Sequence, residues 1–152
     1  MRAAFFMSFS LILTMGTLGL SQSLSDLRNN YVEAVSNKEV CEKMIGELER
    51  NANTSIKLAY LGAFETIWAN HVSNPIAKLR TFKKGKMKIE EAVKKDKDNV
   101  EIRFIRLSIQ KNAPGILGYR SNIKEDELFL KANLHKVSST HLKTQIETIL
   151  EK

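Results

Sequence analysis

Apolar residues recur at helical spacing along most of this chain, and no stretch alternates in the way that predicts a β-strand. The first such stripe runs through Leu24, Leu27 and Tyr31, and others follow after short polar breaks. Apolar residues three, four and seven positions apart lie on one face of a helix, which is then buried against its neighbours. The chain is therefore expected to be all-α.

Polar residues at the breaks mark the beginnings of about seven helices. Ser23, Asn37, Thr54 and Asn74 are each placed to accept hydrogen bonds from free N–H groups of a first helical turn. Pro75 fits the first position of a helix, where its missing N–H is not needed. Because the breaks are short, consecutive helices are expected to form antiparallel hairpins.

Two of the expected helices have distinctive patterns. The helix that ends near Asn70 is apolar on most sides, which predicts a central, buried helix. The next helix is expected to run from Pro75 to about Lys95. Its inward-facing residues are predicted to be Leu79, Phe82, Ile89 and Val93.

The longest irregular segment covers residues 112–122, where Pro114, Gly115 and Gly118 forbid a continuous helix. Asn122 is followed three residues later by Glu125. That spacing predicts a capping box at the start of the sixth helix.

The N-terminal segment predicts export. Arg2 is followed by an uncharged apolar run to Leu20, and small residues at Gly19, Ser21 and Ser23 fit a cleavage site. The alternative is a retained membrane anchor, but the run is short for a permanent span and contains Ser, Thr and Gly. We expect a signal peptide over residues 1–23, a single helical domain over residues 24–152, and release to the periplasm or the extracellular medium without a permanent membrane span.

The chain has one cysteine, Cys41, so it cannot form an internal disulfide bond. Cys41 lies among apolar residues such as Val40 and Met44. This pattern predicts a buried side chain that behaves as a small hydrophobe, and the alternative is a reactive thiol.

One segment resembles a tetratricopeptide repeat. The second helix of such a repeat has a small residue, a bulky residue four positions later and a small residue three positions after that, followed by a turn. Here these positions are filled by Gly85, Ile89 and Ala92, and the polar turn is residues 96–99. Lys97 replaces the usual proline, and Leu61-Gly62 lies too far upstream for a standard first helix. One degenerate repeat over roughly residues 85–112 implies stacked helical hairpins and a binding surface rather than an active site.

A second resemblance is to a group of small exported proteins of Bacteroidota. The residues that carry it are Asn74, Pro75, Lys78, Leu79, Phe82, Lys83, Glu91, Ala92, residues 99–104, Arg106, Gln110, Pro114 and residues 117–119. This resemblance implies export and does not imply any particular activity.

Positive charge is concentrated in one part of the chain. The net charge is +7, which becomes +6 when Arg2 is removed with the signal peptide. From Lys78 to Arg106 there are eleven Lys and Arg residues against five Asp and Glu residues, a surplus of six. Such a segment either binds anionic components of the cell envelope or is simply a solvated helix face. Nucleic acid is not the expected partner, because the lysines are not interleaved with aromatic residues.

Three polar residues share one face of the fifth helix, whose other residues are largely apolar. Arg103, Arg106 and Gln110 lie at positions i, i+3 and i+7. Guanidinium groups beside a buried helix need anionic or carbonyl partners. This stripe therefore predicts a groove that binds a carboxylate or an extended peptide, with Tyr119 and Lys78 as further candidate binding residues.

The same arginines would also fit an internal network. Their partners would then be carboxylates of this chain or the carbonyl groups of residues 112–122. The candidate carboxylates are Glu65, Glu91 and Asp126.

No catalytic or metal-binding motif stands out. His71, His135 and His141 do not have metal-ligand spacing, and no nucleophile or phosphate-binding motif is present. We therefore predict a non-enzymatic module without cofactor or metal that binds a protein or peptide. The alternatives are a binder of anionic envelope components and an enzyme whose residues are distant in sequence.

Overall fold

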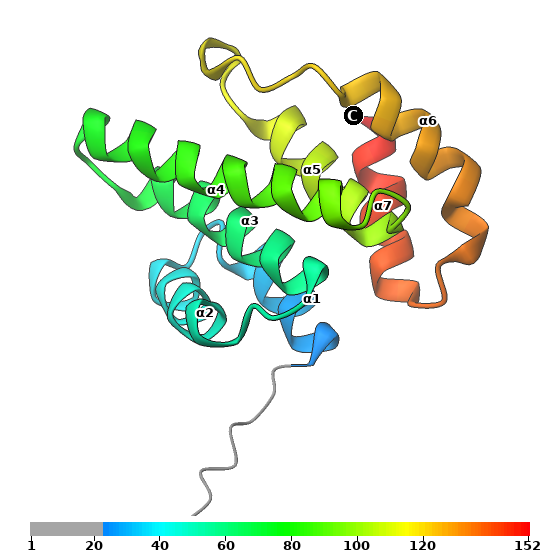
Figure 1. Ribbon diagram of the computed structural model, residues 1–152, viewed down its shortest axis with the longest axis horizontal. Helices are drawn as coiled ribbons and strands as arrows, with labels where there is room; N and C mark the ends of the chain where they lie inside the picture. The colour runs from blue at the N-terminus through cyan, green and yellow to red at the C-terminus, as the bar shows by residue number, and fades with distance from the viewer. Residues whose placement is uncertain (1–22) are drawn as a thin grey trace, which may run out of the picture.

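The computed structural model describes residues 23–152 (Figure 1). Within this range there is no β-strand, which confirms the all-α prediction. The elements are α1 (Leu24–Glu33), α2 (Lys38–Asn51), α3 (Ser55–His71), α4 (Pro75–Lys95), α5 (Val100–Asn112), α6 (Ile123–Asn133), α7 (Thr140–Glu151) and the short 3-10 helices η1 (Gly115–Leu117) and η2 (Leu134–Lys136). The predicted signal peptide lies almost entirely outside the described residues. No helix within them is both long enough and apolar enough to cross a bilayer.

The predicted helix starts are confirmed in the first half of the domain. Ser23, Asn37, Thr54 and Asn74 each accept a hydrogen bond from backbone N–H groups in the first turn of the following helix. Pro75 is the first residue of α4, as expected from its missing N–H. Local chemistry therefore sets these boundaries.

The capping box predicted at the start of α6 is wrong. The Asn122 side chain caps no backbone N–H group, although its Nδ2 donates to the Glu125 carboxylate at 3.2 Å. Its Oδ1 instead accepts from Ser121 Oγ at 2.9 Å and from Gln110 Nε2 at 3.4 Å. The amide oxygen that would cap the helix is engaged by these two side chains.

Helices α3 and α4 lie side by side and antiparallel, and they form the most extensive helix pair of the domain (Figure 1). Two glycines meet where they cross. A Cβ atom on Gly62 would lie only 2.6 Å from the backbone oxygen of Gly85, and a Cβ atom on Gly85 would collide with the Gly62 oxygen. The absence of side chains at both positions lets the backbones approach closely, and α3 is buried on most sides, as predicted.

The remaining helices surround this pair. Helices α1 and α2 pack against α3, whereas α6 and α7 lie together at the other end of the molecule (Figure 1). Helix α5 contacts α3, α4, α6 and α7. It therefore connects the two parts of the domain. The tetratricopeptide-like stacking of the helices stays a prediction.

Most of the predicted inward face of α4 is buried, with one exception. Phe82, Ile89 and Val93 lie in the core, but Leu79 is 41% exposed. Leu79 lies near the N-terminal end of α4, where it lines an open groove between several helices. The helical spacing places Leu79 on the same face as the core residues, but no neighbouring helix covers it there.

Cys41 is fully buried, as predicted from its apolar neighbours. Its thiol lies 3.3 Å from the backbone oxygen of Phe64, to which it donates. Burial raises the pKa of the Cys41 thiol to about 12, so the thiolate form is scarce at neutral pH.

Candidate functional site

Helix α5 carries an unusual set of buried polar side chains. Glu101, Arg103, Arg106 and Gln110 are each at least nine-tenths buried. A charged group removed from water is tolerated only when partners satisfy its charge and hydrogen bonds. The partners of these four residues therefore decide whether the helix is a binding site or a structural element.

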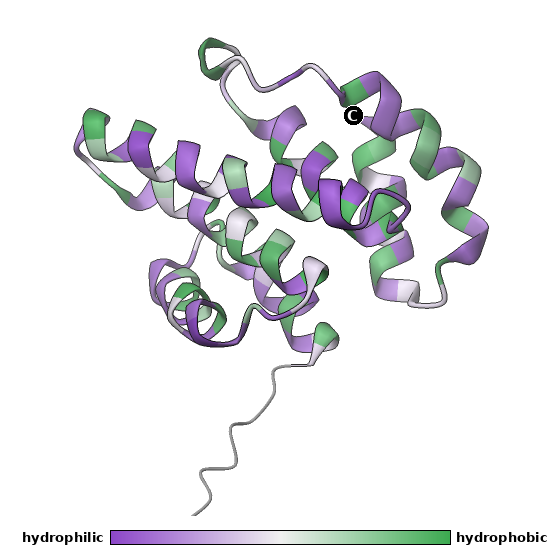
Figure 2. Cartoon of the chain, in the orientation of Figure 1, coloured by the Kyte–Doolittle hydropathy of each residue, from purple (hydrophilic) through white to green (hydrophobic). Residues whose placement is uncertain are grey.

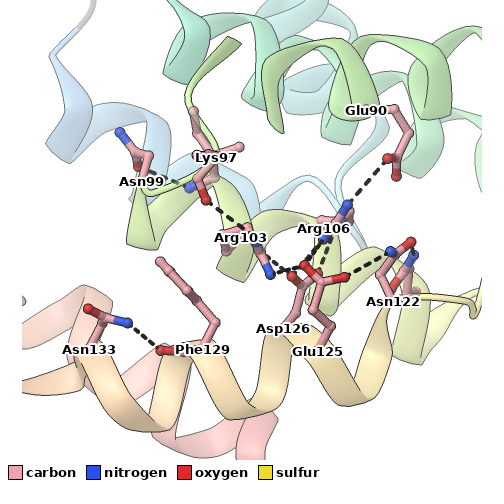
Figure 3. Close-up of polar contacts among 12 residues, drawn as sticks. Glu90, Lys97, Asn99, Arg103, Arg106, Asn122, Glu125, Asp126, Phe129 and Asn133 are labelled. Carbon is pink, nitrogen blue, oxygen red and sulfur yellow. Dashed lines mark hydrogen bonds and ion pairs between the residues drawn. The ribbon is translucent and has the colours of Figure 1, made fainter. Parts of the chain in front are cut away.

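Arg103 and Arg106 share one buried carboxylate, that of Asp126 in α6 (Figure 3). Arg106 binds it through two parallel hydrogen bonds of 2.7 Å, from Nε to Oδ2 and from Nη2 to Oδ1. Nε of Arg103 donates to Oδ1, and its guanidinium group lies 4.6 Å from the centre of the Phe129 ring. Two-point pairing of this kind is the strongest form of an arginine–carboxylate contact.

More acidic groups complete the cluster around the two guanidinium groups. Glu125 accepts from Arg103 Nη2 at 2.6 Å, and Glu90 of α4 accepts from Arg106 Nη1 at 3.3 Å (Figure 3). Burial lowers the pKa of Arg106, but the hydrogen bond and negative charge of Asp126 outweigh that effect and leave its pKa above the usual value. Two cations therefore face three carboxylates, and neither guanidinium group is left without an anionic partner.

Tyr119 joins this cluster from the segment that follows η1. Its hydroxyl donates to Glu90 at 2.6 Å, and its ring packs edge-on against Phe82. Burial, reinforced by the adjacent Glu90 carboxylate, raises the pKa of Tyr119 above its usual range. The side chain thus closes the edge of the core and fixes Glu90.

Gln110 is the least satisfied member of the predicted stripe. Its Nε2 makes one long hydrogen bond, of 3.4 Å, to Asn122. Its Oε1 is buried and has no hydrogen-bond partner among the described residues. The side chain itself is fully buried, so an incoming ligand has no direct access to it.

The structure thus brings four of the five predicted binding residues into one network. Its arginines pair with Asp126, one of the three carboxylates that the sequence suggested as partners for an internal network. Glu65 binds Lys84 and Lys88 instead, and Glu91 binds Lys95. A ligand carboxylate would have to compete with Asp126, Glu125 or Glu90 for the arginines. A role of this stripe in ligand binding stays a prediction.

A second buried network on α5 was not predicted. Glu101 accepts from Arg28 Nη2 and from the Tyr60 hydroxyl, both at 2.6 Å. Arg28 lies 73 residues from Glu101 in the sequence, so no local sequence pattern predicts this ion pair. The hydrogen bond to Glu101 raises the pKa of Arg28.

The described surface contains a groove of about 1180 Å³. Its lining residues come from α1, α3, α4, α5 and α7 and from residues 113–117. Core residues Tyr31, Phe104 and Ile149 contribute to its walls. The groove is therefore continuous with the hydrophobic core.

Several apolar side chains in this groove remain exposed to solvent. Val32 of α1 and Val35, in the turn that follows α1, are each 58% exposed, and Ile116 of η1 is 95% exposed. The half-exposed Leu79 belongs to the same surface. Single exposed apolar residues are common on proteins, but a group of them around one concavity marks an interaction site.

Polar residues also line the groove, several of them from α7. Lys78, the fifth predicted binding residue, is exposed and lines it, and no Asp or Glu is among its described lining residues. The side-chain nitrogen and oxygen of Gln145 in α7 are shielded from solvent, and neither has a hydrogen-bond partner within residues 23–152. A second lysine, Lys152, also lines the groove, which therefore combines apolar walls with two lysines and one unsatisfied amide.

Sequence reasoning missed most of this groove. Its walls come from segments as far apart as α1 and α7, which no spacing rule brings together. The available signal was Ile116, a large apolar residue between Pro114 and Gly118 in a segment that cannot be a regular helix. An apolar side chain at such a place is either packed or left exposed for a partner.

No group of three or more His, Cys, Asp or Glu side chains within residues 23–152 is arranged to hold a metal ion. No protein-family model, curated protein or solved structure matches the chain. The function proposed below therefore rests on the groove and on the charges around it.

Proposed function

We propose that this chain is an exported, non-enzymatic binding module whose groove receives an amphipathic α-helix of a partner protein. The single observation that carries the proposal is the apolar groove between α1, α3, α4, α5 and α7. The N-terminal segment and the resemblances of its sequence support the export part of the proposal.

The size of the groove suits a helix. About ten residues of α-helix, roughly 10 Å wide and roughly 15 Å long, occupy about 1200 Å³. The groove measures about 1180 Å³, above the range of roughly 300–1000 Å³ typical of small-molecule pockets. Helix-in-groove recognition uses apolar side chains at positions i, i+3, i+4 and i+7, which pack on an apolar surface of this kind.

The exposed residues of the groove support the same reading. Leu79, Val32, Val35 and Ile116 gain favourable free energy only when another apolar surface covers them. Core residues of α1 and α5 hold the walls in place. A rigid, preformed groove lowers the entropy loss on binding.

The test uses a fluorescein-labelled amphipathic peptide with leucines at i, i+3, i+4 and i+7 and glutamines on its polar face. We expect the full chain to bind it, as measured by fluorescence anisotropy, and Leu79→Ser and Ile116→Ser to weaken binding about tenfold each. Leu128→Ser is the matched control, because Leu128 is 60% exposed on α6 and does not line the groove. Equal affinity of all three variants, or no binding at all, overturns the proposal.

A second candidate function is binding to an anionic component of the cell envelope through the Lys78–Arg106 segment. It is favoured by Lys78, Arg80 and Lys83, which have no acidic partner among the described residues. Figure 2 shows hydrophilic residues along much of the viewer-facing side of α4. Co-sedimentation with anionic vesicles that is lost at high salt, with no retention by neutral vesicles, is the expected result.

A further inference from the structure

We infer that the helix received by the groove is acidic on its polar face and that Lys78 contacts it. This inference rests on the function proposed above and specifies the partner's chemistry. The first reason is the composition of the groove: the side chains of Lys78 and Lys152 contribute positive charge, and no Asp or Glu is among the described residues that line it. A basic partner would meet charge of its own sign and no compensating carboxylate.

The second reason is the distribution of charge along α4. The first fifteen residues of the helix, Pro75–Ile89, contain six Lys and Arg residues and no Asp or Glu. Lys84 and Lys88 both pair with Glu65, Lys84 also pairs with Glu49, and Lys86 lies over the ring of Tyr119. Lys78, Arg80 and Lys83, in the N-terminal half of α4, have no acidic partner among the described residues, and of these three Lys78 lines the groove.

The third reason is that these cations interact unfavourably with the dipole of the helix that carries them. The N-terminal end of a helix has a partial positive charge, so acidic residues stabilise it and basic residues do not. Helix α4 has no acid in its first turn, and Lys78 and Arg80 follow within its first six residues. A local conflict of this kind is typical of functional sites, and an acidic partner at this end resolves it.

The unsatisfied amide of Gln145 adds a hydrogen-bonding group. Both of its polar atoms are buried without a partner among residues 23–152, and the residue lines the groove from α7. A buried donor without a partner costs free energy until it is satisfied. Because both atoms are shielded from solvent, Gln145 Nε2 can donate to a carboxylate of the partner helix only after its side chain turns toward the groove.

The experiment compares three labelled peptides with identical leucines and with Glu, Gln or Lys on the polar face. We expect the full chain to bind the Glu peptide most tightly and the Lys peptide most weakly, with a preference that shrinks as salt is added. The substitution Lys78→Glu should weaken binding of the Glu peptide about tenfold and leave that of the Gln peptide nearly unchanged. Lys143→Glu is the control, since Lys143 is exposed on α7, does not line the groove and changes the net charge equally.

The outcomes separate this inference from the proposed function. If the Gln peptide binds and the Glu peptide is no tighter, the acidic-partner inference fails while the groove function stands. Equal weakening by Lys78→Glu and Lys143→Glu also overturns the inference, because it indicates attraction by total charge. Failure of all three peptides overturns both. A concentration-dependent dimer that Ile116→Ser abolishes makes a second copy of the chain the occupant, which overturns the inference.

Discussion

Gly62 of α3 and Gly85 of α4 meet backbone to backbone, so that each occupies the space in which a side chain of the other would lie. We predict that Gly85→Ala destabilises the fold by about 1–3 kcal/mol, because overpacking forces the two helices apart. The higher helix propensity of alanine stabilises the helix by only about 1 kcal/mol relative to glycine. Gly46→Ala in α2 is the control, since an added methyl group there meets nothing within 4 Å. Urea denaturation that ranks Gly85→Ala at or above the parent chain contradicts the prediction.

Asp126 is the shared anion of two buried arginines, so its charge should matter more than that of its neighbours. We predict that Asp126→Asn lowers the free energy of unfolding by about 3–5 kcal/mol, because both guanidinium groups lose their buried counter-charge. Glu125→Gln should cost less than about 1 kcal/mol, since that side chain is 60% exposed. Chemical denaturation of the two variants checks the ranking, and an equal loss in both variants counts against a special role for Asp126.

The three tyrosines of the chain, Tyr31, Tyr60 and Tyr119, predict a cooperative alkaline transition. Burial raises the pKa of Tyr31 to about 12, and burial together with a neighbouring carboxylate raises the pKa of the other two. A raised phenol pKa in the folded state contributes stability that is fully present below the ordinary value of 10.0 and is lost as pH rises above it.

The measurement is a pH titration followed by tyrosinate absorbance and by far-ultraviolet circular dichroism. We expect no tyrosinate as the folded protein passes pH 10.0, and then its appearance together with the loss of helix signal. Tyrosinate that forms in a fully helical protein near pH 10.0 shows that at least one phenol is accessible. Tyr119→Phe identifies whether that phenol is the one bound to Glu90.

The sequence was a good guide to the helices and a poor guide to the groove. Helix starts depend on contacts between residues two or three positions apart, so Asn37, Thr54 and Asn74 were predictable one by one. The failure at Asn122 has the opposite cause, since a side chain twelve residues away engages its amide oxygen. A local rule cannot include a competitor that only the fold brings near.

The same limit applies to the candidate site. Helical spacing showed that Arg103 and Arg106 share a face, and the need for counter-charges suggested Asp126 among their partners. The contribution of Glu90 and the exposure of Leu79 depend on how α4 lies against the rest of the domain. The packing of one helix against another determines such contacts and exposures. They cannot be predicted from the periodicity within a single helix.

The buried charges of α5 also constrain the order in which the chain acquires its structure. Glu101 finds its partners in segments that precede it, whereas the two arginines depend on Asp126, which follows them by twenty residues or more. A chain emerging from the ribosome can assemble the first four helices while α5 still lacks its main counter-charge. Before α6 is synthesised, burial of α5 would leave Arg103 without a carboxylate partner and Arg106 with Glu90 alone. The final packing of α5 against the earlier helices thus depends on a residue in the last quarter of the sequence.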